Sequence, residues 1–294
     1  MKKLFISLGL CLCVGFAATA QDVVVVEEVS NPAYTSNRGV SLLPEAGDFA
    51  LGIEATPFLE YLGKLFTSGN SAPTFNGVDN MIYGKYFLED NRAIRVKLRL
   101  NIYQDQHKGT VANDAEIATN PLNSLATAVD VQKINTQDVE LYVGYEFRRG
   151  RGRVQGFYGG EVSLGYNGGK AIYDYGNPMT ELNQNPSTTN FGSNVAVPGQ
   201  RVTESRYGSQ FSFGLGGFVG VEYFFAPQIS VGGELGLGFK YSTRGQTENK
   251  MEAFDAASNQ IQTLENRTRN ANDLAQTVGL RTRTYGNIFL MFHF

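Results

Sequence analysis

This chain of 294 residues contains few side chains of the kinds that act as catalytic bases or metal ligands. It contains two histidines, His107 and His293, and the spacing of the sequence selects no nucleophile for either. A serine nucleophile needs a base within hydrogen-bond reach, so a site at His107 would draw on one of four serines: Ser163, Ser209, Ser212 or Ser242. Walker loops, dinucleotide-binding glycine fingerprints and His-Glu-x-x-His runs do not occur. We therefore predict that the protein is not an enzyme and has no cofactor and no metal site.

Charged side chains, by contrast, recur on alternate residues. Arg95, Lys97 and Arg99 alternate with large aliphatic residues, and the segment 137–148 alternates in the same way around Glu140. Successive side chains of a strand point to opposite faces, so each segment has one apolar and one charged face. We predict a charge network that lines a barrel lumen and is formed by six acidic and six basic residues: Glu54, Lys85, Arg95, Lys97, Arg99, Glu140, Glu146, Glu161, Glu222, Glu234, Lys240 and Arg283.

Two roles are open to this network. Isolated charges in a lumen cost free energy, whereas paired and hydrogen-bonded charges are tolerable. An eight-stranded barrel is just wide enough to be filled by its own side chains. The balance of the charges therefore favours a plug of ion pairs that holds the barrel together, and an ion path is the alternative. His293 is expected among the polar lumen residues, and His107 is interpreted as an exposed loop residue.

The positions of the apolar residues predict eight strands. They are expected at about 48–56, 80–88, 92–103, 137–148, 155–166, 209–225, 229–241 and 280–294. Short turns centre on residues 90, 151 and 227, and long connections cover 57–79, 104–135, 167–206 and 243–277. Bacterial barrels have an even strand number, short periplasmic turns and long outer loops. The predicted fold is all-β, an eight-stranded antiparallel up-and-down transmembrane β-barrel with long extracellular loops and short periplasmic turns. A helical turn after Pro57 and a helix near 249–265 are also expected.

The last ten residues have the pattern of a strand with one face in lipid. Counting back in twos from the terminal phenylalanine gives only large apolar residues. An apolar strand at the open edge of a soluble sheet would promote aggregation, whereas a closed barrel has no edge. The stretch resembles the terminal assembly signal of outer-membrane barrels, and this resemblance implies that role for Tyr285, Gly286, Ile288, Leu290, Phe292 and Phe294.

The first twenty residues resemble a secretory signal peptide. Lys2 and Lys3 precede a short apolar run, and Ala18-Thr19-Ala20 forms a small-x-small cleavage site, so we expect cleavage after Ala20. The chain then divides into a signal peptide (1–20), a periplasmic N-terminal lead-in (21–47) and the barrel (48–294). Both cysteines lie in the part removed, which leaves no thiol for disulfides or metals.

Composition agrees with this class of protein. The chain contains 34 Gly, 15 Tyr and 20 Phe, which fits glycine- and aromatic-rich alternating strands. Removing two lysines leaves 23 basic against 28 acidic residues, a formal charge of −5 that argues against nucleic acid as a partner. No run of about 18 apolar residues follows Ala20, so no spanning helix is expected.

The strand pattern and the aromatic terminus resemble the small outer-membrane β-barrel superfamily, which includes the membrane domain of OmpA and the OmpX-like proteins. The segment 43–52, with Thr56-Pro57-Phe58-Leu59 and Tyr61-Leu62-Gly63, resembles outer-membrane proteins of Bacteroides-type bacteria. The resemblance covers about 48–294 and implies insertion by the barrel-assembly machinery and contact with outer-membrane lipid and lipopolysaccharide. It implies no catalytic residues, and we expect no counterpart of the peptidoglycan-binding domain of full-length OmpA.

These observations predict a protein of the outer membrane of a Gram-negative bacterium. The preferred function is non-enzymatic, a structural or surface-interaction (adhesin-like) role with long loops for an extracellular ligand and a lumen plugged by charge pairs. One alternative is a narrow, porin-like channel for small solutes. The other is a lipid A-modifying barrel enzyme that uses His107.

Overall fold

The structure is a computed structural model that describes residues 41–55, 81–123, 125–191, 196–267 and 276–294. The predicted signal peptide, most of the predicted lead-in and the helical turn expected after Pro57 lie outside these ranges. Residues 46–47 form a turn before the first strand, with Gly47 at a positive φ of 96°. Among the described helices, none is long and apolar enough to cross a membrane.

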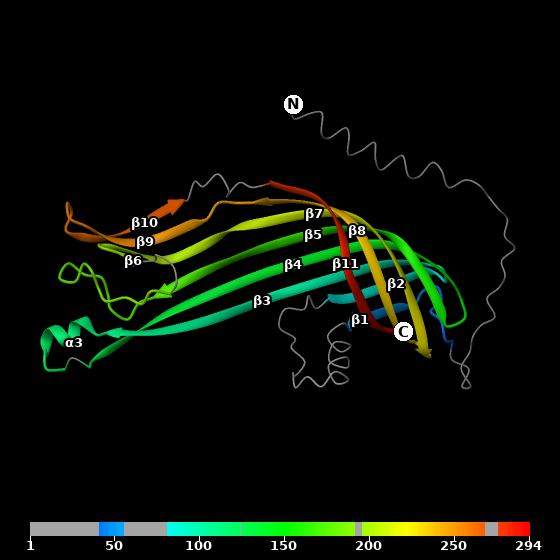
Figure 1. Ribbon diagram of the computed structural model, residues 1–294, viewed down its shortest axis with the longest axis horizontal. Coiled ribbons are helices and arrows are strands. Elements are labelled where there is room, and N and C mark those ends of the chain that lie inside the picture. The colour runs from blue at the N-terminus through cyan, green and yellow to red at the C-terminus, as the bar shows by residue number, and fades with distance from the viewer. Residues whose placement is uncertain (1–40, 56–80, 124, 192–195, 268–275) are drawn as a thin grey trace, which may run out of the picture. The chain divides into compact units, whose positions relative to one another are not determined.

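Eight antiparallel strands close into a ring (Figure 1). Following the ring, the order is β1-β2-β3-β4-β5-β7-β8-β11, and β11 pairs with β1. This confirms the predicted eight-stranded antiparallel barrel. The bounds are β1 Phe49–Glu54, β2 Met81–Glu89, β3 Arg92–Ala112, β4 Thr127–Arg151, β5 Val154–Asp174, β7 Gln200–Ala226, β8 Ile229–Arg244 and β11 Gln276–His293.

The first and last strands close the ring. Ala50 pairs with His293 and Glu54 with Phe289 in the antiparallel register. Phe49 and Phe294 exchange two backbone hydrogen bonds of 3.1 and 2.8 Å, and their rings stack with centroids 5.2 Å apart. The strand that ends the chain therefore has partners on both sides, β1 and β8.

Short turns join the strands at one end of the ring, which we call the short-turn end. They lie at residues 90–91, 152–153 and 227–228, as predicted. Gly152 and Gln228 adopt positive φ values of 64° and 61°, which let the chain reverse within two residues. The long connections leave the opposite end.

Several strands are longer than predicted, and the loops expected at 104–135 and 167–206 are shorter. β3 and β4 stay paired as far as Ala112 and Thr127, and the connection between them holds the short helix α3, Asp114–Thr119. β5 runs to Asp174, and β7 begins at Gln200. The prediction failed because both faces of these strand ends are largely polar, so the apolar alternation that marks a lipid-facing strand is lost while the backbone pairing continues.

The helix predicted near 249–265 is wrong. This segment is a hairpin of β9, Glu248–Asp255, and β10, Gln260–Arg267. Asn259 has a φ of 55°, a left-handed conformation that Asn tolerates and that does not continue a right-handed helix. The two-residue β6, Ala196–Val197, pairs with the start of β7.

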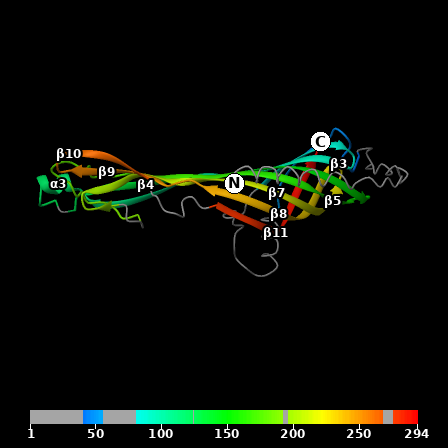
Figure 2. The ribbon, with the colours of Figure 1, turned by 90° about the horizontal axis from the view of Figure 1, so that it is seen from above.

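Beyond the ring, the ends of β3, β4, β5 and β7 form a sheet with β9 and β10, which we call the sheet extension (Figures 1 and 2). β7 changes partner at this point: Gln210 pairs with β8, whereas Arg206 pairs with β9. A register shift on β7 near Gly208 marks the change. A small apolar cluster around Ala171, Tyr173 and Val202 packs within the extension.

Candidate functional site

The wall of the ring has one apolar and one polar face. On β7 the outward side chains Phe213, Val219 and Val221 are about half exposed, whereas the inward Phe218 and Glu222 are buried. The same alternation holds on β1, β2, β3 and β4. The outward residues are those predicted to face lipid, including the Ile94–Ile102 row of β3.

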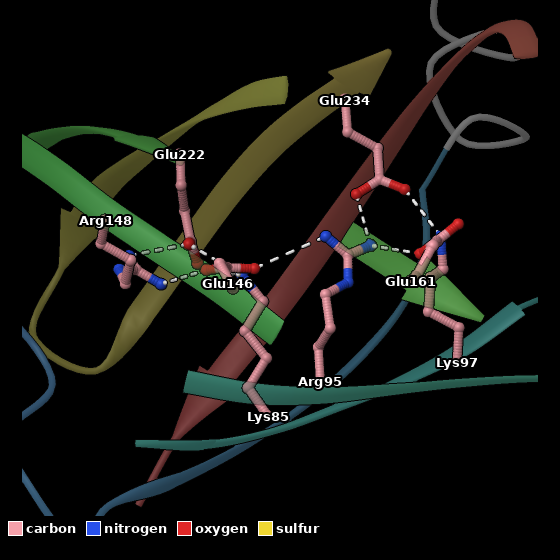
Figure 3. A network of polar contacts seen from close by, with 8 residues as sticks. All are labelled: Lys85, Arg95, Lys97, Glu146, Arg148, Glu161, Glu222 and Glu234. Atoms are coloured by element: carbon pink, nitrogen blue, oxygen red, sulfur yellow. Dashed lines mark hydrogen bonds and ion pairs between the residues drawn. The ribbon is translucent and has the colours of Figure 1, made fainter. Parts of the chain in front are cut away.

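Inside the ring, charged side chains from different strands meet in one connected network (Figure 3). At the short-turn end, Lys85 Nζ lies 3.0 Å from Glu146 Oε1 and 3.3 Å from Glu222 Oε2. Arg148 contacts the same two glutamates, at 3.2 and 2.9 Å. Two acids and two bases therefore alternate around one centre, and the side chains of Lys85 and Arg148 are each 2% exposed.

A second group of charges follows towards the long-loop end. Arg95 Nη2 lies 2.5 Å from Glu234 Oε2, and Lys97 Nζ lies 3.0 Å from Glu234 Oε1 and 2.8 Å from Glu161 Oε2. Arg95 also lies 3.5 Å from Glu146, which joins the two groups. The Arg95–Glu146 contact runs between the neighbouring strands β3 and β4, whereas Arg95–Glu234 crosses the lumen to β8.

A third group of ion pairs, centred on Glu140, lies on the long-loop side. Glu140 lies 2.8 Å from Arg99 and 2.9 Å from Lys240, and Arg99 also pairs with Asp138 at 3.4 Å. Glu54 is buried on the inner face of β1. The backbone of Arg283 pairs with β8, but its side chain lies outside what the structure describes.

Sequence reasoning missed Arg148, the last residue of the strand expected at 137–148. Arg148 stands two residues after Glu146 on a strand that continues to Arg151, so the same alternation that selected Glu146 also places Arg148 inside. Ser230 was missed because a serine next to a turn has no distinguishing pattern.

His293 and Ser230 both contact Glu222, a member of the network at the short-turn end. His293 Nε2 is 3.0 Å from Ser230 Oγ and 3.3 Å from Glu222, and Ser230 donates a hydrogen bond of 2.5 Å to Glu222. In a catalytic triad the serine and the acid face different nitrogens of the histidine. Here one nitrogen faces both, and all three side chains are buried, so this is a structural cluster that anchors the terminal strand.

Aromatic rings fill the space between the ion pairs. In the lumen, Phe157 packs against Phe218 and Phe289, with ring centroids 6.2 and 5.9 Å apart. Lys85 Nζ lies 4.7 Å from the Phe157 centroid, and Arg95 Cζ lies 3.8 Å from that of Phe218. Cation–π contacts of this kind stabilise charges that have lost their water.

A cavity of about 260 Å³ lies on the long-loop side of this packing. Arg99, Glu140, Glu161 and Lys240 line it, together with glycines of β7 and β8. The cavity thus ends at the buried charges, and these continue from Glu161 through Arg95 to Glu146.

His107 lies on β3 in the sheet extension, exposed, and not in a loop as predicted. The hollow beside it is lined by Gln132, Ile134, Tyr173, Phe191 and Tyr207, and none of the four candidate serines borders it. Ser163 and Ser242 are buried in the ring, and Ser209 contacts the Tyr166 hydroxyl at 3.3 Å. Within the described part of the chain, no group of three His, Cys, Asp or Glu side chains is placed to hold a metal ion.

Four of the predicted assembly residues, Ile288, Leu290, Phe292 and Phe294, share the outward face. Phe292 and Phe294 are 41% and 56% exposed, and Ile288 and Leu290 are partly exposed. The orientation of Tyr285 and Gly286 lies outside what the structure describes.

A β-sheet protein can span a lipid bilayer only as a closed ring, with an apolar band on its outside and its charges paired inside. The fold is that of a transmembrane β-barrel. On every ring strand for which side chains are described, apolar side chains face outward and polar side chains face the lumen, as predicted. Such an apolar exterior would be unstable in water.

No protein-family model and no curated protein matches the chain. Among solved structures, OprG from Pseudomonas aeruginosa is similar at 11% identity and a TM-score of 0.30, over 86% of this chain and 98% of that one. A major outer membrane protein from Thermus thermophilus matches at 12% identity and 0.34, over 85% and 100%. Outer membrane protein W from E. coli matches at 12% and 0.30, over 86% and 100%. The fold assignment rests on the ring and on the two faces of its wall.

Proposed function

We propose that the protein is a non-enzymatic outer-membrane barrel that does not conduct and that holds a β-sheet above the membrane for surface interaction. The observation that carries this proposal is the buried network that runs from Arg148 through Glu146 and Arg95 to Glu161 and Glu234 across the lumen. Ions would have to break several ion pairs between buried groups to pass, and removing one partner from such a pair is costly.

The surface role is supported by the sheet extension. Four ring strands continue past the lipid-facing band, and β9 and β10 widen the sheet. Loops of outer-membrane barrels on the long-connection side face the cell exterior, so this sheet would be presented outside the cell. Among the residues that the structure describes, no serine borders the hollow beside His107, which supports a non-enzymatic role. The bacterial group is proposed only from the resemblance of the segment 43–52 to Bacteroides-type proteins.

A planar-bilayer recording on the refolded mature chain tests the closed lumen. The wild type is expected to show no large, steady conductance. The double variant Arg95→Ala/Glu234→Ala removes a pair that crosses the lumen without leaving one charge unpaired, so it serves as the opened control. A steady ohmic conductance of the wild type, equal to that of the double variant, would contradict the proposal and favour a channel.

The narrow channel is the second candidate, and the cavity of about 260 Å³ next to Glu140 and Lys240 is the observation that favours it. The lipid A-modifying enzyme is tested separately: His107→Ala should leave the lipid A mass spectrum of expressing cells unchanged. A change in that spectrum that depends on His107 would establish enzymatic activity.

A further inference from the structure

The outer wall of the barrel contains a hollow of about 570 Å³ on β3, β4, β5 and β7. Four polar side chains line it, one from each strand: Gln104, Asn135, Lys170 and Arg206; Gln137 of β4 lines it as well. Among the residues that the structure describes, no acidic side chain lines the hollow. It therefore offers two positive charges and three amides to a ligand that lies against it.

The strand register places these four residues in one row. Gln104 pairs with Asn135, Asn135 with Lys170, and Lys170 with Arg206. Residues directly opposite on neighbouring strands share a face. Lys170 stands four residues after the outward Tyr166, so the row points away from the barrel interior.

The same register fixes where the row lies relative to lipid. Four residues closer to the short turns, or five on β7 because of its register shift, Leu100, Val139, Tyr166 and Phe211 form a row of apolar and aromatic residues. The rings of Tyr166 and Phe211 lie 5.2 Å apart. Tyrosine marks the membrane–water interface. Four residues of a strand tilted by about 40° rise by about 10 Å, which puts the polar row beside lipid headgroups and not acyl chains.

The charges in the row are poorly balanced within the protein. Lys170 and Arg206 lie directly opposite each other, and like charges in this position are destabilising. Glu204 pairs with Arg206 at 3.3 Å, and Glu248 faces Arg206 from β9 but pairs with Arg267 at 3.0 Å. Neither glutamate borders the hollow, so an external anion would relieve the repulsion there.

We propose that this row binds the phosphate-bearing saccharide headgroup of an outer-leaflet lipid, the lipid A part of lipopolysaccharide. Lys170 and Arg206 hold a phosphate through charge-assisted hydrogen bonds, and the guanidinium adds a planar donor pair. Gln104 and Asn135 bind hydroxyl groups of the sugar beside it. This inference rests on the proposed function, because the hollow meets headgroups only where the ring spans the outer membrane.

The test compares binding of bisphosphorylated and dephosphorylated lipid A to the purified, folded protein in detergent micelles. The variant is Lys170→Gln/Arg206→Gln. The matched control is Lys108→Gln/Lys250→Gln, which removes two exposed lysines of the sheet extension outside the hollow. Each basic residue near an anionic lipid surface contributes a similar binding free energy. Removing two of them should weaken the binding of bisphosphorylated lipid A about 30-fold, whereas the control variant should bind like the wild type.

Three results would overturn the inference: equal affinity of the variant and the wild type, no preference for the phosphorylated lipid, or equally tight binding of inorganic phosphate alone. A heat-modifiability gel on the same samples separates this failure from failure of the barrel. A gel shift on boiling shows a folded barrel, so its presence together with phosphate-independent binding contradicts only the headgroup site. Its absence in the wild type contradicts the proposed function as well.

Discussion

Arg95 on β3 and Glu234 on β8 lie 2.5 Å apart across the lumen, although 139 residues separate them in the sequence. This contact joins two strands that are not neighbours in the ring, so it forms only once the ring has closed. Glu234 also binds Lys97, and Arg95 also reaches Glu146, so the pair belongs to a network in which each charge has more than one partner.

Glu222→Gln should strongly destabilise the barrel. It leaves Lys85 and Arg148, both buried, with one acid fewer, and breaking a buried ion pair from one side costs about 3–5 kcal/mol. Urea unfolding in micelles, followed by circular dichroism and by the gel shift, measures the free energy of unfolding. The control Glu265→Gln removes an exposed partner of Lys250 and should change it by less than about 1 kcal/mol. Equal effects of the two substitutions would show that the lumen charges are not desolvated.

Gly220→Ala should destabilise the barrel because the lumen has no room there. A Cβ at Gly220 would lie 2.2 Å from Phe157 Cζ and 2.4 Å from the carbonyl oxygen of Gly233. Overpacking of this kind costs about 1–3 kcal/mol. Gly233→Ala is the matched control, since the nearest atom to its Cβ is 3.8 Å away. The same unfolding experiment checks both, and tolerance of Gly220→Ala would mean that Phe157 does not fill the lumen.

Asn177→Ala should loosen the sheet extension and leave the barrel intact. The Asn177 amide donates to the carbonyls of Ala112 and Ser187 at 2.7 and 3.0 Å and accepts from the Asp114 N–H at 3.0 Å. Losing these buried partners costs about 1–3 kcal/mol locally. Hydrogen exchange over residues 175–191 should accelerate.

The control for this experiment is Gln184→Ala, which removes only an exposed contact to the Glu181 carbonyl. It should exchange like the wild type. If Asn177→Ala also abolished the gel shift on boiling, the extension and the ring would be one cooperative unit, contrary to this expectation.

Asp114 makes the extension sensitive to acid. Burial raises the pKa of its carboxyl, but hydrogen bonds from Ser187 and Asn183, both 2.7 Å, outweigh burial and hold the pKa below its ordinary value. A depressed folded pKa contributes stability that is present above the unfolded value of about 3.9 and is lost as the pH falls through the folded value.

The amide proton of Ser187 reports this titration directly by NMR. Its chemical shift should move with a midpoint below the ordinary Asp value, and Asp114→Asn should abolish the movement. A midpoint at or above the ordinary value would mean that these hydrogen bonds do not favour the carboxylate.

Alternation predicted the wall of the barrel well and its extension poorly. Ile94 and Arg95 fall on opposite faces because lipid accepts only one of them, so the sequence carries a clear signal there. Beyond Ile102 both faces of β3 are largely polar, so the strand continues to Ala112 without that signal. The β9–β10 hairpin was mistaken for a helix because its decisive feature is one left-handed residue, Asn259.

The lumen residues could be selected from the sequence, but their partners could not. Alternation places Lys85 and Glu222 inside without showing that they meet, since 137 residues separate them. Which charges pair depends on the diameter of the ring and on the stagger of its strands. These quantities depend on all eight strands together and on no local pattern.

The most direct test of the membrane-spanning ring is a spin-label accessibility scan along residues 211–225 of β7 in lipid bilayers. The two cysteines of the chain are Cys11 and Cys13, so a protein that is expressed from residue 21, after the expected cleavage site, accepts single cysteine labels. Collision rates with oxygen should peak at odd positions such as Val219 and Val221 and fall at even positions such as Phe218. Peaks at the even positions, or odd positions reached by a water-soluble nickel reagent, would contradict the account.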